Sequence, residues 1–254
     1  MSYRHIQTEV ANGIGTLILN RPPVNVLNIE MMEEMNKALE ALGKEKIKFL
    51  VIKAVGKAFS AGVDVSEHMG GLADKMIEVF HGIFRNMDKL TVPSIALVDG
   101  SALGGGCELA LYCDMVVASE RAKFGQPEIQ VGVFPPIAAL IFPRIMGQKK
   151  AMELILSGEI IGAQAAYEMG LVNIVVPVES FVGESEKFIS KFSNLSGVVM
   201  RLTRKAVFAG LNDDVDKGLE KIEKIYLKEL MKTADAQEGL QSFLDKRKPE
   251  WKER

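Results

Sequence analysis

Cysteine and histidine are scarce in this sequence. Its 254 residues include two cysteines, Cys107 and Cys113, which lie six positions apart in one apolar segment. On a helix they would face different directions, so we expect no disulfide between them and infer a reducing compartment. The three histidines are scattered without the spacing of metal ligands, which argues against a zinc site, and we expect no bound metal.

The sequence also has only a small net charge and no long apolar run. The 31 basic and 33 acidic residues give a net charge of −2, which provides no electrostatic attraction for nucleic acid or an anionic membrane. No apolar run reaches the ~18 residues of a membrane span, and the N-terminus has no signal-peptide core. We therefore expect a cytoplasmic protein with no membrane partner and no nucleic-acid partner.

What the sequence does contain is an alternation of strand and helix patterns. A chain of this length, 48% apolar, can bury roughly three quarters of its unfolded surface. Asn12-Gly13 between two β-rich runs predicts a hairpin, and the later alternation predicts an α/β fold with parallel strands and crossover helices. We expect strands at 6–10, 14–19, 49–55, 94–98, 115–118 and 174–176, and helices at 31–42, 72–90 and 107–113.

The C-terminal third has a different pattern. Beyond Pro143 helical segments dominate, and the basic run at 245–249 is interpreted as a solvated helix end. We expect an α/β core over residues 1–192 and a helical oligomerisation region over residues 193–254. The second region carries more apolar surface than a short tail needs for its own packing, in a stripe at helical spacing formed by Val215, Leu219, Ile222, Tyr226 and Leu230.

Three glycines, Gly104 to Gly106, follow a predicted strand and its loop and open a helix. Glycines let a backbone approach a ligand closely, and the free N–H groups at a helix start can stabilise an oxyanion. The alternative is that these glycines only permit a tight turn. Glu108 favours chemistry, because a glutamate in an apolar helix is costly to bury unless it is paired or catalytic.

A second glutamate, Glu128, also has apolar neighbours. Two carboxylates in a dry pocket shift each other's pKa, so that one can act as acid and the other as base. The alternative is that each glutamate is an exposed helix-start residue. The loop from Ala58 to Asp64 also follows a strand, where α/β folds bind ligands. It could instead be a plain connection in which Asp64 caps the next helix.

Together these segments resemble the three signature blocks of the enoyl-CoA hydratase (crotonase) family. The blocks are Lys57-Ala-Phe-Ser-Ala-Gly-Val-Asp64, Gly104-Gly-Gly-Cys-Glu-Leu-Ala110 and Phe124-Gly-Gln-Pro-Glu128, in the family's order and spacing. The resemblance covers essentially the whole chain. It implies a crotonase-like spiral of ββα units with a C-terminal helical trimerisation region. It also implies an acyl-CoA substrate, no cofactor besides the coenzyme A of that substrate, and a homotrimer or a dimer of trimers.

The resemblance also assigns roles to individual residues. The backbone N–H groups of Val63 and Gly105 would form an oxyanion hole, and Glu108 and Glu128 would be the catalytic pair. Lys57 matches a lysine near the CoA phosphates. The other residues assigned to substrate binding are Val24, Ala61, Asp64, Gly104, Pro127, Val133 and Pro135.

Both glutamates are present, which favours hydration over isomerisation and over a non-enzymatic acyl-CoA- or RNA-binding role. In the family's pattern Glu108 activates the water that attacks the β carbon, and Glu128 protonates the α carbon.

The chain departs from that pattern at Pro136, where many hydratases have a glycine whose N–H helps to hold the water. Pro136 could simply start a helix, or it could make the pocket wall rigid and apolar. This segment resembles the branch that hydrates cyclohexa-1,5-diene-1-carbonyl-CoA.

Overall fold

A computed structural model describes residues 3–254, which build two β-sheets. The larger sheet contains, in spatial order, β1 (Ile6–Ala11), β2 (Ile14–Leu19), β3 (Phe49–Ala54), β5 (Ser94–Val98), β7 (Met115–Ser119) and β10 (Ile174–Val176). β1 and β2 form the expected antiparallel hairpin, and the other pairs are parallel. Asn12 and Gly13 both have positive φ, as a tight two-residue hairpin turn requires.

The smaller sheet contains β4 (Ala58–Ser60), β6 (Ser101–Leu103), β8 (Lys123–Gly125) and β9 (Ile160–Gly162). β4, β6 and β8 are parallel, and β9 is antiparallel to β8. Each of β3, β5 and β7 in the larger sheet is followed by one short strand of the smaller sheet and then by helical residues. The chain therefore winds through repeated ββα turns, which confirms the spiral fold expected from the resemblance.

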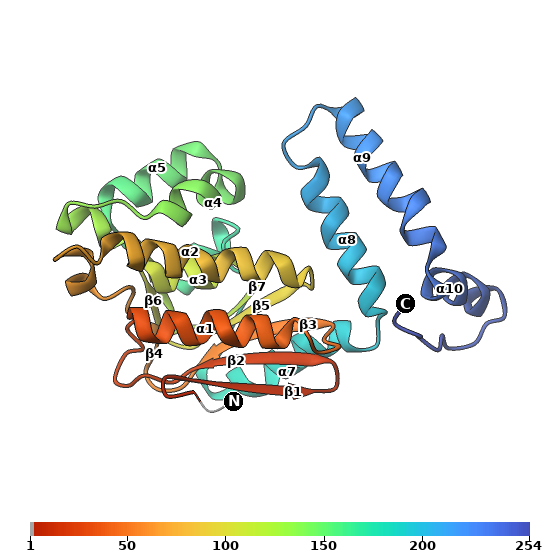
Figure 1. Cartoon of the computed structure of the whole chain (residues 1–254), viewed down its shortest axis with the longest axis horizontal. Helices are drawn as coiled ribbons and strands as arrows, with labels where there is room; N and C mark the ends of the chain where they lie inside the picture. Colours follow the sequence, from red (N-terminus) through yellow and green to blue (C-terminus); the bar gives the residue numbers. More distant parts are fainter. Residues whose placement is uncertain (1–2) are drawn as a thin grey trace.

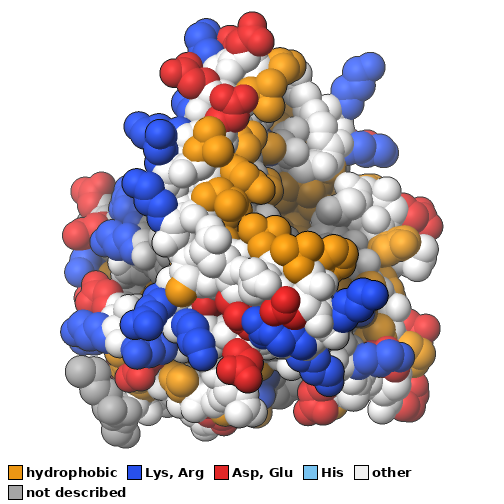
Figure 2. Space-filling model, turned by 90° about the vertical axis from the view of Figure 1, so that its right-hand side faces the viewer, with side chains coloured by type: hydrophobic (Ala, Val, Ile, Leu, Met, Phe, Trp, Pro, Cys, Tyr) orange, Lys and Arg blue, Asp and Glu red, His pale blue; other side chains and the backbone are white. Residues whose placement is uncertain are grey.

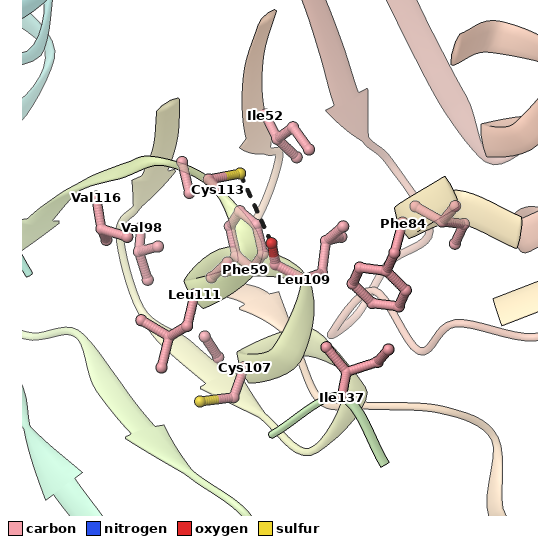
Figure 3. Close-up of a cluster of buried hydrophobic side chains, with 14 of the residues drawn as sticks. Ile52, Phe59, Phe84, Val98, Cys107, Leu109, Leu111, Cys113, Val116 and Ile137 are labelled. Atoms are coloured by element: carbon pink, nitrogen blue, oxygen red, sulfur yellow. Dashed lines mark hydrogen bonds between the residues drawn. The ribbon is translucent and has the colours of Figure 1, made fainter. Parts of the chain in front are cut away.

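Three helices form the core with these sheets: α1 (Ile29–Leu42), α2 (Ala73–Leu90) and α3 (Gly105–Tyr112). α1 and α2 lie side by side along the molecule (Figure 1). α3 begins two residues earlier than expected and is buried from Gly105 to Leu111. Its apolar side chains enter the main core, where Cys107 and Cys113 point in different directions and remain free thiols, as their spacing predicts (Figure 3).

The later helices are α4 (Pro136–Met146), α5 (Gln148–Ser157), α6 (Ala163–Glu168), α7 (Phe181–Ser193), α8 (Gly197–Gly210), α9 (Val215–Lys228) and α10 (Ala234–Leu244). Short 3₁₀ turns are η1 (Val65–His68), η2 (Pro127–Val131), η3 (Val178–Ser180) and η4 (Leu230–Lys232).

None of the helices among residues 3–254 combines the length and the apolar character that a membrane-spanning helix needs. Two expectations were wrong in detail: the loop between the strand at 94–98 and Gly104 contains β6, and Leu230 belongs to η4 rather than continuing the helix that carries the rest of its apolar stripe.

The helices after α7 form an arm. α8 and α9 extend away from both sheets as a helical hairpin (Figure 1). Arg204 of α8 anchors the arm, because its Nε donates to both carboxylate oxygens of Asp114 at 2.9 Å. Three residues of the apolar stripe remain exposed on α9 within one chain, since Val215 is 76%, Leu219 is 50% and Tyr226 is 53% exposed.

A groove of about 1180 Å³ lies between this arm and the core. The molecule is hollowed on this face, and apolar side chains gather in the hollow (Figure 2). The last turns of α4 form one wall and α8 forms another. Apolar lining residues from these two helices are Leu140, Ile141, Ile145, Val199, Val207 and Phe208.

Candidate functional site

The site is organised by three parallel strands that end at the same edge of the smaller sheet. Ser60 of β4 pairs with Ala102 of β6, and Leu103 of β6 pairs with Gly125 of β8. The segments that leave these strand ends are therefore neighbours, and the N–H of Gly104 donates to the carbonyl of Gly125 at 2.9 Å. Carboxyl ends of parallel strands are the usual ligand-binding edge of an α/β sheet.

The N–H of Val63 is the first candidate donor. The carbonyl of Gly62 accepts a hydrogen bond from the N–H of Leu27 at 2.9 Å. In a planar trans peptide the N–H points opposite to the C=O, so the Val63 N–H is directed away from Leu27. Within residues 3–254 it has no acceptor. Gly62 has a φ of 104°, which a residue with a side chain rarely adopts.

The N–H of Gly105 is the second candidate donor. As the first residue of α3, Gly105 carries an N–H that its own helix cannot bond. A Cβ on Gly105 would lie 2.6 Å from the Cγ2 of Val63, and a Cβ on Gly62 would lie 3.6 Å from the Gly105 nitrogen. The two loops are therefore in contact, and both donors lie beside one another. Such a pair can stabilise a negatively charged oxygen.

Glu108 lies one turn into α3 and is only 2% exposed. Its Oε1 accepts hydrogen bonds from the N–H groups of Ile137 at 2.7 Å and Ala138 at 2.8 Å, at the start of α4. Burial is the main cause that raises the pKa of Glu108 to about 8, and the charge of Glu128 adds to it. The alternative of an exposed helix-start glutamate is therefore wrong for Glu108.

Pro136 is the first residue of α4, where a helix needs no N–H donor. The helix-start interpretation of Pro136 is thus confirmed. Its position also lets the next two N–H groups reach Glu108. Pro135, the residue before the helix, is buried.

Glu128 approaches the same space from η2. A Cβ on Gly104 would lie 2.7 Å from the Glu128 Oε1, so the glycine leaves room for this carboxylate. Partial burial raises the pKa of Glu128 to about 7. Gln126, which is fully buried, can donate from its amide nitrogen to the two carboxylate oxygens at 3.1 and 3.2 Å. Gln126 was not predicted as a site residue. Its polar side chain between Gly125 and Pro127, in an otherwise apolar segment, could have indicated it.

The other predicted substrate-binding residues divide into two groups. Val24 and Ala61 are joined by a hydrogen bond from the Ala61 N–H to the Val24 carbonyl at 2.9 Å, next to the Val63 loop. Asp64 caps η1, since its Oδ1 accepts from the Ser66 hydroxyl and from the Ser66 N–H, and the bond from the hydroxyl is the main cause that lowers the pKa of Asp64. Asp64 therefore caps the helical turn that follows it, as the alternative interpretation of this loop predicted.

The second group consists of Lys57, Val133 and Pro127. Lys57 precedes β4, so the length of that strand, roughly 10 Å, separates it from the two N–H donors. Lys57 is exposed, and Val133 is 38% exposed beyond η2. Pro127 opens η2 and helps to set the direction of Glu128. In the described part of the chain, no group of three His, Cys, Asp or Glu side chains could hold a metal ion.

Comparison with known proteins identifies the class to which this site belongs. The model of the enoyl-CoA hydratase/isomerase family matches residues 9–254, and the chain belongs to that family. A Rhizobium meliloti protein described as a probable enoyl-CoA hydratase is 37% identical, with 100% of both chains covered. The cyclohexa-1,5-dienecarbonyl-CoA hydratase of Thauera aromatica is 34% identical over 94% of this chain and 92% of its own.

The solved structures agree with this assignment. A crystal structure of an enoyl-CoA hydratase subunit from Geobacillus kaustophilus superposes with a TM-score of 0.91. It is 32% identical in sequence, and the match covers 99% of both chains. The crotonase fold is therefore established for this protein.

The raised pKa values predict how stability depends on pH. The folded protein keeps protons on Glu108 and Glu128 that the unfolded chain releases above about pH 4.5. The free energy of unfolding should therefore fall as pH rises from about 5 to 8, by up to ~1.4 kcal/mol per pH unit for each proton. In Glu108→Gln this slope should become smaller, as urea unfolding at several pH values would measure. The exposed Glu220→Gln is the control, and parallel curves for Glu108→Gln and wild type would contradict the prediction.

Proposed function

We propose that this enzyme hydrates the α,β double bond of an enoyl-CoA through an enolate held by the N–H groups of Val63 and Gly105. One observation carries the proposal: two carboxyl groups with pKa values near 7 and 8 border the same space as two unbonded N–H donors. Groups that titrate near neutrality can give and take protons at working pH. The hydratase names of full-length relatives support the same reaction.

The chemistry follows from the positions of these groups. The thioester carbonyl oxygen accepts from Val63 and Gly105, which makes the β carbon electrophilic. A water between the carboxyl groups loses a proton to Glu108 as its oxygen bonds to the β carbon, and negative charge moves to the thioester oxygen. Glu128 then protonates the α carbon, and the enolate returns to a thioester. The two N–H groups of α4 favour the ionised state of Glu108 that this step needs.

Removing either acid–base group should slow hydration sharply. Glu108→Gln and Glu128→Gln should each lower kcat by ~10²–10⁴-fold, the usual contribution of a general acid or base. Mass spectrometry of the product decides the reaction type, because hydration adds one water and isomerisation changes no mass. Circular dichroism should show an intact fold in both variants. Near-normal turnover in both would remove the carboxylates from the mechanism.

We further propose that the substrate is a cyclic dienoyl-CoA. Pro135 and Pro136 form a rigid wall beside the two N–H groups that hold Glu108, and Pro136 has no N–H of its own to bind a water. The relative from Thauera aromatica, named for such a substrate, supports this choice. A flat, stiff ring suits a stiff apolar wall better than a flexible chain does.

Pro136→Gly tests the substrate proposal. The wild type should hydrate cyclohexa-1,5-diene-1-carbonyl-CoA well and crotonyl-CoA poorly, because an apolar wall discriminates by ~1–3 kcal/mol per methylene-sized misfit. Pro136→Gly adds an N–H near the water and should raise kcat/KM for crotonyl-CoA relative to the cyclic substrate. Pro177→Gly, before η3 and remote from the site, should leave the ratio unchanged. Efficient crotonyl-CoA hydration by the wild type, with no response to Pro136→Gly, would refute the proposal.

Lys57 supports acyl-CoA recognition. Its ammonium is exposed at the far end of β4, at a distance from the N–H donors that an extended pantetheine arm can span. An exposed cation suits the CoA phosphates, as the resemblance implies. We therefore place the nucleotide end of the substrate near Lys57 and the reacting end at Glu108 and Glu128.

We propose that three chains, or two sets of three, form the active assembly. The exposed apolar stripe of α9 and the apolar groove beside α8 are the surfaces that support it. Light scattering should give the mass of three or six chains. Leu219→Glu on α9 should lower that mass, whereas Lys224→Gln, which changes the charge by the same amount, should not. A stable single chain at micromolar concentration would contradict the proposal.

A further inference from the structure

Ser60, the last residue of β4, is a fully buried polar residue that no catalytic step uses. Its hydroxyl donates to the carbonyl of Asn25 at 2.8 Å and accepts from the N–H of Gly62 at 3.2 Å. Gly62 directly precedes Val63, so this second bond holds the loop that presents the first N–H donor.

Ser60 also touches the loop of the second donor. A Cβ on Gly106 would lie 2.5 Å from the Ser60 Cβ and 2.7 Å from its Oγ, so the serine packs directly on the backbone of α3. Gly106 directly follows Gly105. One side chain therefore contacts the residue before the first donor and the residue after the second.

The partner that holds Ser60 is itself fixed. Asn25 is fully buried, and its side-chain nitrogen donates to the carbonyls of Val55 and Ala58 at 2.9 Å each. Its Oδ1 accepts from the N–H of Arg21 at 2.7 Å. The Ser60 hydroxyl thus connects a rigid anchor to both loops, and its direction is determined by two hydrogen bonds.

We propose that Ser60 is a positioning residue that sets the spacing and direction of the Val63 and Gly105 donors. This inference rests on the proposed function, because it matters only if these donors bind a thioester oxygen that becomes an oxyanion. Without the hydroxyl, the N–H of Gly62 would lose its acceptor, and the Ala61–Gly62 peptide could rotate and shift the adjoining Gly62–Val63 peptide that carries the Val63 N–H. A donor displaced from the developing charge loses much of its catalytic effect.

A purely structural role is the competing explanation, and Ser94 provides the matched control. Ser94 is also buried, and its hydroxyl likewise donates to one group and accepts from another: Asp114 Oδ2 and the Asp114 N–H, both at 3.0 Å. It is remote from the N–H donors. Ser94→Ala should therefore reproduce the loss of a buried hydroxyl without moving an N–H donor.

The experiment compares Ser60→Ala, Ser60→Cys and Ser94→Ala in the whole enzyme. Two readouts are used: the split between kcat and KM for the enoyl-CoA substrate, and the absorption band of bound 4-(dimethylamino)cinnamoyl-CoA. That band moves to longer wavelength when the thioester carbonyl is polarised. Ser60→Ala should lower kcat by ~10–100-fold with little change in KM, and the band should shift less. Ser60→Cys should recover part of both, and Ser94→Ala should keep both.

Each result decides the proposal. Wild-type kcat and band shift in Ser60→Ala, or equal losses in Ser94→Ala, would overturn it. If Ser60→Ala does not fold, Ser60→Cys is compared with wild type, and unchanged values in that variant would overturn it. A wild type that polarises the probe but hydrates no enoyl-CoA would refute the proposed function, while the band shifts of the Ser60 variants would still test the positioning role.

Discussion

Every group in the candidate site depends on the parallel pairing of β4, β6 and β8, in which the register of β4 and β6 shifts between Ala58 and Ser60. Val63 and Gly105 each lie three residues beyond the paired residues Ser60 and Ala102, and Glu128 lies three residues beyond Gly125. A slip of one residue would turn side chains to the opposite face and separate the two donors. Each strand in this sheet has only three residues, so the longer parallel sheet and the helices around it must hold the register.

The pair of desolvated carboxyl groups at the end of this sheet destabilises the folded protein. Two carboxyl groups are taken out of water, which raises both pKa values, and the charge of Glu128 raises the pKa of Glu108 further. The structure offsets the cost in part with backbone donors from α4 on Glu108 and with the amide of Gln126 on Glu128. The same desolvation that weakens the fold brings both groups to a pKa at which proton transfer is efficient.

The alternation of strands and helices, the carboxylate pair and the glycine turns could be predicted from the sequence, because each has a local signal, whereas the ββα order came from the resemblance to the enoyl-CoA hydratase family. Glu108 stands out as a charge in an apolar helix, and Gly105 opens that helix. The short strands β4, β6, β8 and β9 were not predicted, since three residues are too few for a period, whereas the equally short β10 was predicted because its three residues are all apolar. Ser60 and Gln126 were missed for another reason: their importance lies in contacts with Gly62, Gly106 and Glu128, which only the folded chain brings together.

Helix α4 joins two parts of the molecule that are otherwise separate. Its first turn holds the Glu108 carboxylate, and its last turns line the apolar groove beside the arm. At eleven residues it is about 16 Å long, and Pro143 in its interior removes one backbone hydrogen bond between the two ends. An occupant of the groove that shifts the first turn of α4 would alter the two hydrogen bonds on Glu108. In that case protonation of Glu108 and occupancy of the groove would be thermodynamically linked, and each would change the other by the same free energy.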